Sequence, residues 1–204
     1  MESLAAGLMA LHVEIPPERE NTLLGYLELL DKWNKIYNLT AIREPERMLS
    51  QHLLDSLSVY HYVAGTNILD VGSGGGFPGI PLAIAFPEKN FVLLDSSQKK
   101  TTFLRQATIE LKLTNVSVVC DRVEIWRPAH LFDIIISRAF SDLATFARLA
   151  GRLCEPHGAM LAMKGRHPNE EAAQIPGNVM IDRVIPLHVP QLEAQRHLVI
   201  MKVK

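Results

Sequence analysis

The middle of the chain alternates between short apolar runs and segments in which apolar residues recur every three or four positions. The apolar runs predict buried strands at residues 67–71, 90–95, 116–120, 132–137 and 159–163. The segments between them predict helices near residues 79–86, 98–112 and 141–154. Strands and helices that alternate in this way form a parallel sheet, covered on both faces through right-handed crossovers.

The two ends of the chain have other patterns. The first part reads as helical, with one helix from Pro16–Pro17 to Asn38 and a second from Pro45 to about Gly65. The last part holds two strand-like runs, VMIDRVIPL and HLVIMKV, which predict an antiparallel final pair. The sequence therefore predicts an α/β fold with a seven-stranded, mostly parallel sheet, an antiparallel terminal strand and helices on both faces.

The stretch NILDVGSGGGFPG, residues 67–79, reads as a strand, a loop and the start of a helix. Glycine fills five of the eight positions from Gly72 to Gly79, which no regular element would tolerate. Pro78 and Pro81 suit the first turn of the helix after the loop, where a missing N–H costs little. We therefore expect a ligand to approach this backbone closely at the carboxyl end of a strand.

The glycine loop fits two kinds of nucleotide ligand, and a plain tight turn is a third interpretation. Gly74, Gly76 and Gly79 satisfy the dinucleotide pattern G-x-G-x-x-G, and Asp95 follows Gly74 by about 20 residues. The acid directly before the loop, Asp70, would repel a pyrophosphate but would pair with an ammonium group. S-adenosylmethionine carries such an ammonium, has no phosphate, and has a ribose diol from which Asp95 could accept hydrogen bonds. We therefore favour S-adenosylmethionine over NAD as the cofactor.

Composition and charge limit the possible function classes. A chain of 204 residues with 48% hydrophobic content fits one globular domain with an appendage, and we divide it into a helical cap over residues 1–65 and a cofactor-binding domain over residues 66–204. The formal charge of -1 gives no general nucleic-acid signature, so any contact with RNA must come from a local basic patch. Cys120 and Cys154 read as buried thiols, and the sequence shows neither metal-ligand spacing nor a membrane-length apolar run. We expect a cytoplasmic protein, with no metal and no membrane segment.

Polar residues directly after the predicted strands should gather at one edge of the sheet. The run from Asp121 to Glu124 is a candidate adenine-binding loop, and a solvated loop is the alternative. Arg138 could hold a phosphate or a guanine edge, and an exposed surface arginine is the alternative. Lys164 directly follows another predicted strand, so it is a candidate for the same substrate-side role as Arg138. A basic rim that could steer RNA comprises Lys99, Lys100 and Arg105.

The second predicted helix carries two polar residues whose role the pattern leaves open. His52 and Asp55 lie three residues apart in the run QHLLDS. They could approach the glycine loop, or they could form a pair that is satisfied on the face of the helix.

Motifs along nearly the whole chain resemble those of one known family. They are KWNKIYNLTAIREPERML, QHLLDSL, ILDVGSGGGFPGIPLAI, LLDSSQKKTTFLRQ, ISRAF, AMKG and RHLVI. The chain resembles the ribosomal RNA small subunit methyltransferase G family, RsmG, formerly called glucose-inhibited division protein B. The resemblance implies a class I methyltransferase (Rossmann-like) fold with a helical N-terminal extension, and methylation of N7 of one guanine in 16S ribosomal RNA. The chain departs from the family pattern at Gln51, where arginine is common, and at Ala194–Gln195, where Gly-Glu often precedes Arg-His.

The resemblance also implies site residues. It implies cofactor contacts from Gly72, Phe77, Val123, Glu124 and Arg138, and Asp95 matches the acid of the family's LLDS motif. The full expected cofactor site adds residues of the glycine loop and comprises Asp70, Gly72, Gly74, Gly76, Phe77, Asp95, Val123, Glu124 and Arg138. We expect Arg138 and Lys164 at the reaction centre. The expected RNA-binding residues are Lys99, Lys100, Arg105, Arg122, Lys164, Arg166 and Arg196.

The loop after the fourth predicted strand agrees with this chemistry. Guanine N7 has a free lone pair in the plane of the base, so its methylation needs alignment and desolvation but no general base. The loop reads SRAF, and it has neither the NPPY-type motif of amino-group methyltransferases nor a nucleophilic cysteine. Two rival interpretations remain, an NAD-dependent oxidoreductase and a non-catalytic ribosome-assembly factor with the same fold. We expect 16S ribosomal RNA or the small ribosomal subunit as the partner, and a monomer.

Overall fold

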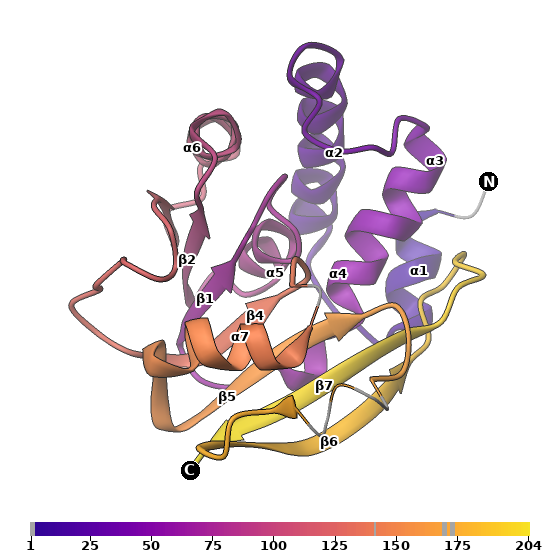
Figure 1. Cartoon of the computed structure of the whole chain (residues 1–204). Helices are drawn as coiled ribbons and strands as arrows, with labels where there is room; N and C mark the ends of the chain where they lie inside the picture. Colours follow the sequence, from indigo (N-terminus) through magenta and orange to yellow (C-terminus); the bar gives the residue numbers. More distant parts are fainter. Residues whose placement is uncertain (1–2, 141, 169–170, 172–173) are drawn as a thin grey trace.

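The computed structural model describes residues 3–140, 142–168, 171 and 174–204 (Figure 1). Its strands are β1 (Asn67–Val71), β2 (Asn90–Asp95), β3 (Val116–Cys120), β4 (Phe132–Ser137), β5 (Cys154–Lys164), β6 (Val179–Leu187) and β7 (Arg196–Val203). They form one seven-stranded sheet in the order β3-β2-β1-β4-β5-β7-β6. The first five strands pair in parallel, and β7 pairs antiparallel with both β5 and β6. The predicted sheet and its antiparallel final pair are confirmed.

The helices differ more from the sequence-based expectation. Four helices correspond to predicted ones, namely α2 (Pro17–Tyr37), α5 (Gly79–Ala85), α6 (Gln98–Glu110) and α7 (Leu143–Ala150). A short helix that the pattern did not predict, α1 (Leu4–Ala10), precedes them. The expected second helix is divided into α3 (Pro45–Met48), the π-helical turn η1 (Leu49–Leu54), α4 (Asp55–Leu57) and the 3-10 turn η2 (Tyr60–Tyr62). A further 3-10 turn, η3 (Gly151–Leu153), comes after α7, and residue 141 of the helix expected at 141–154 lies outside the described residues.

Side chains alternate between the two faces of the sheet, as a strand period of two requires. In β4, Ile134 and Ile136 belong to a core beneath the N-terminal helices, α5 and α6, whereas Ile135 belongs to a core beneath α7. Figure 1 shows α7 in front of the sheet, with α2 and α5 on the far side. The central strands β1, β2 and β4 are therefore largely buried on both faces, which explains their nearly continuous apolar sequences, whereas β3 and β6 are partly exposed.

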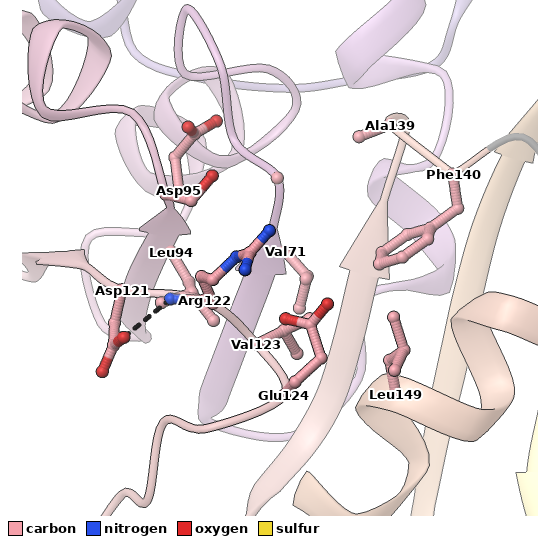
Figure 2. Close-up of a pocket in the computed structure, with 12 residues that line it drawn as sticks. Val71, Leu94, Asp95, Asp121, Arg122, Val123, Glu124, Ala139, Phe140 and Leu149 are labelled. Carbon is pink, nitrogen blue, oxygen red and sulfur yellow. Dashed lines mark hydrogen bonds between the residues drawn. The ribbon is translucent and has the colours of Figure 1, made fainter.

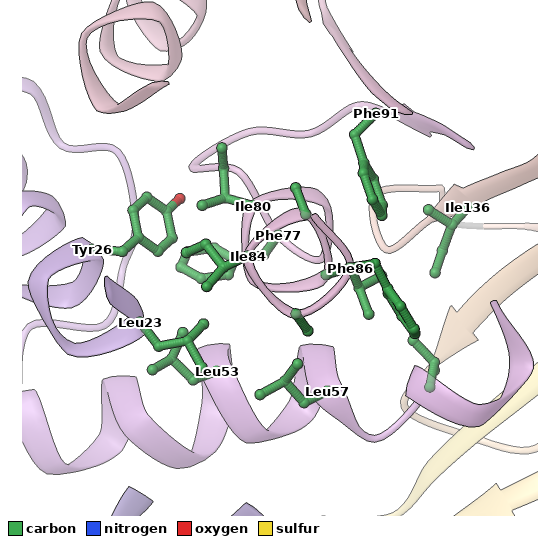
Figure 3. Packing of buried hydrophobic residues seen from close by; sticks show 14 of the residues in the cluster. Leu23, Tyr26, Leu53, Leu57, Phe77, Ile80, Ile84, Phe86, Phe91 and Ile136 are labelled. Atoms are coloured by element: carbon green, nitrogen blue, oxygen red, sulfur yellow. The ribbon is translucent and has the colours of Figure 1, made fainter. Parts of the chain in front are cut away.

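The N-terminal helices share their core with the sheet. Figure 3 shows Leu23, Leu53 and Leu57 gathered around α5, where they pack near Ile80 and Ile84. All five side chains are fully buried. Since burial of such a side chain is worth about 1.5–3 kcal/mol, this contact fixes the helices against the back of the glycine loop.

Caps and turns set several element ends. The Ser97 side chain accepts a hydrogen bond from Lys100 N at the start of α6, and Asp142 accepts from Thr145 N at the start of α7. Asn38 ends α2 in the left-handed conformation, with φ of 48°. Within the described ranges, no helix combines the length and the apolar character needed to cross a membrane.

Candidate functional site

The glycine loop between β1 and α5 requires glycine for two different reasons. Gly72, Gly74 and Gly76 have positive φ angles of 73°, 59° and 88°. A Cβ atom at Gly76 would collide with the Tyr26 hydroxyl and would lie 2.7 Å from Ile80 Cγ1, so this position must be glycine for the fold. A Cβ atom at Gly74 would meet nothing closer than 3.8 Å, so this position faces open space. Gly74 therefore has room for a ligand beside it.

Hydrogen bonds hold the loop in place without a ligand. Gly72 N and Ser73 N both donate to the carbonyl oxygen of Leu94, over 2.7 and 3.2 Å. The Tyr26 hydroxyl of α2 donates to the carbonyl oxygen of Gly75. The loop is thus fixed both to the neighbouring strand and to the N-terminal helices.

Asp70 lies beneath the loop and not at its surface. Its side chain is fully buried, and Oδ2 accepts a hydrogen bond of 2.9 Å from Gly79 N, at the start of α5. Its other oxygen has no hydrogen-bond partner among the described residues. Burial raises the pKa of Asp70 to about 7, although the Gly79 hydrogen bond opposes this shift. The expected ion pair between Asp70 and a cofactor ammonium is therefore not available in this arrangement, because residue 70 shares the strand face that α5 covers.

Asp95 holds the edge of the loop from the end of β2. Its Oδ2 accepts a hydrogen bond of 2.8 Å from Gly74 N, and its Oδ1 accepts one of 2.8 Å from Ser97 N. Each carboxylate oxygen has a second lone pair, so Asp95 can still accept from hydroxyl groups. The carboxylate therefore lies beside the open glycine of the loop, as expected for a ribose acceptor.

A cavity of about 240 Å³ opens at the carboxyl ends of β1, β2 and β4 (Figure 2). We call it the first cavity, and its lining residues are Val71, Gly72, Leu94, Asp95, Ser96, Asp121, Arg122, Val123, Glu124, Ala139, Phe140 and Leu149. Figure 2 shows the charged ends of Arg122 and Glu124 projecting into it, between Asp95 on one side and Phe140 on the other. Four of the nine expected cofactor residues line this cavity, namely Gly72, Asp95, Val123 and Glu124.

The segment after β3 is held in place by α7 and the turn next to it. The guanidinium of Arg152 in η3 donates to the carbonyl oxygens of Val123 and Trp126. Asp121 accepts a hydrogen bond of 2.7 Å from Arg122 N, which shapes the turn at the cavity wall. The candidate adenine-binding loop is therefore an ordered wall of the cavity and not simply a solvated loop.

The lining of the first cavity fits S-adenosylmethionine better than a dinucleotide. Three carboxylates line it, from Asp95, Asp121 and Glu124, against one cation, from Arg122. This excess of negative charge opposes a pyrophosphate but not a positively charged sulfonium nucleoside. Val71 and Phe140 add apolar surface against which a nucleoside can pack.

A second cavity, of about 330 Å³, lies at the same edge of the sheet, and we call it the arginine cavity. Its lining residues are Ile42, Gln51, His52, Asp55, Arg138, Met163, Lys164, Gly165 and Arg196. Two consecutive residues line different cavities, since Arg138 lines the arginine cavity and Ala139 lines the first.

Arg138 contacts the N-terminal helices and lies over Phe77 of the loop. Its Nη1 donates to Asp55 Oδ2 over 2.8 Å and to the carbonyl oxygen of Gln51 over 2.9 Å. Its Cζ lies 5.4 Å from the ring centroid of Phe77. The departure from the family pattern at Gln51 leaves this contact intact, because the backbone carbonyl and not the side chain is the acceptor.

His52 approaches the loop, where it stacks on Phe77, whereas the Asp55 side chain contacts Arg138 and not His52. His52 Nε2 lies 2.9 Å from Thr40 Oγ1, and its Nδ1 lies 3.3 Å from Arg138 Nη2. Burial and the neighbouring positive charge of Arg138 lower the pKa of His52 to about 3. The imidazole is therefore neutral at physiological pH.

The other expected basic residues divide into two groups. Lys164 forms an ion pair of 2.9 Å with Glu171, whose other oxygen accepts from Leu143 N over 2.8 Å. Arg196 lines the arginine cavity with Lys164, and Arg166 is exposed just beyond β5. On the opposite side of the loop lie Lys99, Lys100 and Arg105 of α6, together with Arg122 in the first cavity. Arg105 reaches the carbonyl oxygen of Val118 and lies furthest along the helix from the loop.

Sequence patterns left three supporting residues unrecognised. Thr40, Arg152 and Glu171 position His52, the loop at Val123 and Lys164, respectively. None of the three contacts follows from a helical or strand spacing in the sequence. Within the part of the chain that the structure describes, no group of His, Cys, Asp or Glu side chains is arranged to hold a metal ion.

Solved structures share this fold. The O-methyltransferase from Bacillus cereus, solved with SAH, aligns with a TM-score of 0.63 and 20% identity over 98% of this chain and 97% of its own. A SAM-dependent methyltransferase from Aquifex aeolicus aligns with a TM-score of 0.58 and 18% identity over 85% of this chain and 98% of its own. The sheet has the fold of a class I S-adenosylmethionine-dependent methyltransferase.

Sequence relatives define the family. A family model described as rRNA small subunit methyltransferase G matches residues 19–199. Proteins named ribosomal RNA small subunit methyltransferase G are 57% identical in Laribacter hongkongensis, over 97% of this chain and 96% of the relative, and 55% identical in Nitrosococcus oceani, over 96% and 92%. The chain belongs to the rRNA small subunit methyltransferase G family, and the expected family is confirmed. These findings support neither an NAD-dependent oxidoreductase nor a non-catalytic assembly factor.

Proposed function

We propose that this protein transfers a methyl group from S-adenosylmethionine to N7 of a guanine in 16S ribosomal RNA. The observation that carries the proposal is the pair of cavities at one edge of the sheet, one rich in carboxylates and lined by Ala139, the other rich in cations and lined by Arg138. A sulfonium cofactor matches the first cavity and an RNA nucleotide matches the arginine cavity. Membership of the rRNA small subunit methyltransferase G family supports the choice of substrate.

The first cavity supplies the cofactor site in this proposal. S-adenosylmethionine, when bound, supplies an electrophilic methyl group. Asp95 accepts hydrogen bonds from the ribose hydroxyls, and the wall at Val123 and Glu124 holds the adenine. Gly72 and Gly74 let the backbone approach the cofactor, whereas Gly76, Phe77 and Asp70 support the loop from behind.

The arginine cavity supplies the substrate side. Guanine N7 carries its own lone pair, so the protein has to align the base and exclude water, but it does not have to remove a proton. Arg138 and Lys164 position the nucleotide, and hydrogen bonds to its O6 or phosphate leave N7 free to attack. Arg166 and Arg196 extend this positive surface, and Lys99, Lys100, Arg105 and Arg122 extend it on the other side of the loop.

The biological setting belongs to the same proposal. Because the substrate is ribosomal RNA, the protein acts in the cytoplasm, on naked 16S ribosomal RNA, on a precursor particle or on the small ribosomal subunit. It works as a monomer, with residues 1–65 as a cap on the cofactor-binding domain of residues 66–204.

The proposal is tested by incubating the protein with methyl-labelled S-adenosylmethionine and each of those three substrates, prepared without the modification. We expect one of the three to accept close to one methyl group per RNA, and heat-denatured protein to transfer none. Incorporation at or below the level of the denatured control with all three substrates would contradict the proposal.

A further inference from the structure

The carboxylate of Asp55 joins two arginines that lie far apart in the sequence. Its Oδ2 accepts from Arg138 Nη1 over 2.8 Å, and its Oδ1 accepts from Arg196 Nε over 3.0 Å. The Asp55 side chain is only 2% exposed, so an RNA substrate cannot reach it. The side chains of Arg138 and Arg196 are 27% and 25% exposed, so both can meet a ligand in the arginine cavity.

Electrostatics explain why a carboxylate is needed at this position. Two guanidinium groups that converge on one cavity repel each other, and the repulsion is strongest where water is excluded. Asp55 neutralises one of the two charges and fixes both groups through charge-assisted hydrogen bonds. His52, which also faces Arg138, is neutral and adds no charge. A net positive cavity with ordered donors therefore remains.

The backbone next to Asp55 contributes to the same arrangement. The turn η1 is π-helical and ends directly before Asp55. It presents the carbonyl oxygen of Gln51 to Arg138 Nη1 at 2.9 Å, beside the carboxylate. Such π-helical turns occur frequently at functional sites, because they re-aim backbone and side-chain groups. Arg138 is thus held by two acceptors from one turn of the cap.

Both arginines keep donors for a ligand. In the described part of the chain, Arg196 uses Nε for Asp55 and Nη1 for the carbonyl oxygen of Gln195, and its Nη2 makes no hydrogen bond. Arg138 Nε likewise makes none there, since its contacts run through Nη1 and Nη2. Guanidinium groups with N–H groups to spare are suited to phosphate oxygens and to the O6 edge of guanine.

We propose that Asp55 is a positioning residue for the substrate, which holds Arg138 and Arg196 so that their remaining N–H groups bind the phosphate and the base edge of the target nucleotide in the arginine cavity. The inference rests on the proposed function, because it assigns the substrate side of the same site. Asp55 itself touches neither the RNA nor the cofactor.

A double-mutant cycle tests this role, with Asp55→Asn, Arg196→Ala and the double variant measured against the wild type. Single-turnover methylation of RNA is monitored at saturating S-adenosylmethionine over a range of RNA concentrations, and cofactor affinity is measured by calorimetry. We expect Asp55→Asn to lower the rate at limiting RNA at least about tenfold while cofactor affinity changes less than about twofold. The rate of the double variant at limiting RNA should be within about threefold of the rate of the slower single variant, because both changes remove the contact between Asp55 and Arg196.

A matched control separates positioning from a general loss of structure. Asp31→Asn removes another acid of the cap, which pairs with Lys35 on the surface of α2, and it should leave the rate unchanged. Rates are expressed per cofactor-binding site, so a smaller folded fraction does not mimic the effect. A normal rate per site in Asp55→Asn, or effects that multiply in the double variant, would overturn the proposal.

The outcomes remain distinct from those that test the proposed function. If Asp55→Asn does not fold, the test relies on Arg196→Ala, in which Asp55 still holds Arg138. An Arg196→Ala protein whose methylation rate depends on RNA concentration as that of the wild type does would overturn the inference. An active wild type with an unaffected Asp55→Asn removes only the positioning role. A wild type that transfers no methyl group to RNA overturns the proposed function, and this inference with it.

Discussion

The imidazole of His52 stacks on the phenyl ring of Phe77, with ring centroids 4.3 Å apart and an angle of 12° between the planes. His52 belongs to the helical cap and Phe77 to the glycine loop, so the stack joins the cap to the back of the first cavity. Arg138 lies over the same phenyl ring, so a cation and an imidazole both contact one residue of the loop. The cap therefore supports the site and is more than an appendage to the sheet.

The buried His52 should make stability depend on pH. Its pKa in the folded state is lowered to about 3, against about 6.5 in the unfolded chain, so protonation favours unfolding. The stabilisation from the neutral ring is complete above about pH 6.5 and is lost as the pH falls, by at most about 1.4 kcal/mol per unit. Between pH 7.5 and pH 5.0, the wild type should lose about 2 kcal/mol more unfolding free energy than His52→Gln.

Urea unfolding at the two pH values measures this difference. His130→Gln, in an exposed loop, serves as the control and should keep the pH dependence of the wild type. If the wild type and His52→Gln lose the same unfolding free energy between the two pH values, His52 is not a buried neutral group.

Gly74 offers a test of the loop as a cofactor site. Gly74→Asp adds a side chain on the open side of the loop, so we expect the protein to stay folded while its affinity for S-adenosylmethionine falls below detection by calorimetry. Gly177→Asp makes the same change at a glycine with nothing within 4 Å of its Cβ position, and it should bind as the wild type does. A folded Gly74→Asp protein with unchanged affinity would remove the loop from the cofactor site.

Asp95 should carry part of the cofactor affinity. Removing a charged acceptor costs about 1.5–3 kcal/mol, so Asp95→Ala should weaken S-adenosylmethionine binding on the order of tenfold to a hundredfold. Loss of the bond to Gly74 N adds to this effect, because the loop loses an anchor. Glu110→Ala, at the far end of α6, is the control. A change in affinity of less than about threefold for Asp95→Ala would place the ribose elsewhere.

The centre of the sheet could be predicted from the sequence because β1, β2 and β4 are largely buried on both faces and read as continuous apolar runs. β1 to β4 have the predicted bounds, whereas β5 begins at Cys154, before the predicted start at residue 159. The early part of β5 contains Pro156 and Gly158, which break the strand pattern, and the register with β4 shifts there, between the pair at Cys154 and the pair at Ala159. The division of the second helix at η1 could not be read from local periodicity, because its apolar residues keep helical spacing.

The site could be predicted less completely. The loop, Asp95 and the wall at Val123 could be expected from their positions after strands, and the structure brings them together. Asp70 shows the limit of that reasoning. Its place at the end of a strand suggested exposure, but residues two apart in a strand share a face, so Asp70 lies under α5 together with Ile68. Asp55 lies outside local reasoning, since its partner Arg196 is far away in the sequence.

Arg138 separates positioning of the substrate from binding of the cofactor. Arg138→Lys keeps the charge but loses the planar fork that contacts Asp55 and Gln51 together. Small displacements in alignment can cost on the order of a hundredfold in rate, so single-turnover methylation should fall far more than cofactor affinity. If Arg138→Lys methylates at the normal rate, or loses cofactor affinity in full proportion to its rate, Arg138 does not position the substrate and is at most part of the cofactor site.

The chemical position of the transferred methyl group tests the proposed activity most directly. RNA methylated by the wild-type protein is digested to nucleosides, and the labelled product is compared by chromatography and mass spectrometry with standards of 7-methylguanosine and of its base-methylated and ribose-methylated isomers. We expect the label in 7-methylguanosine, at a single guanine of 16S ribosomal RNA. Label in any other nucleoside, or label spread over many guanines, would contradict the proposed activity.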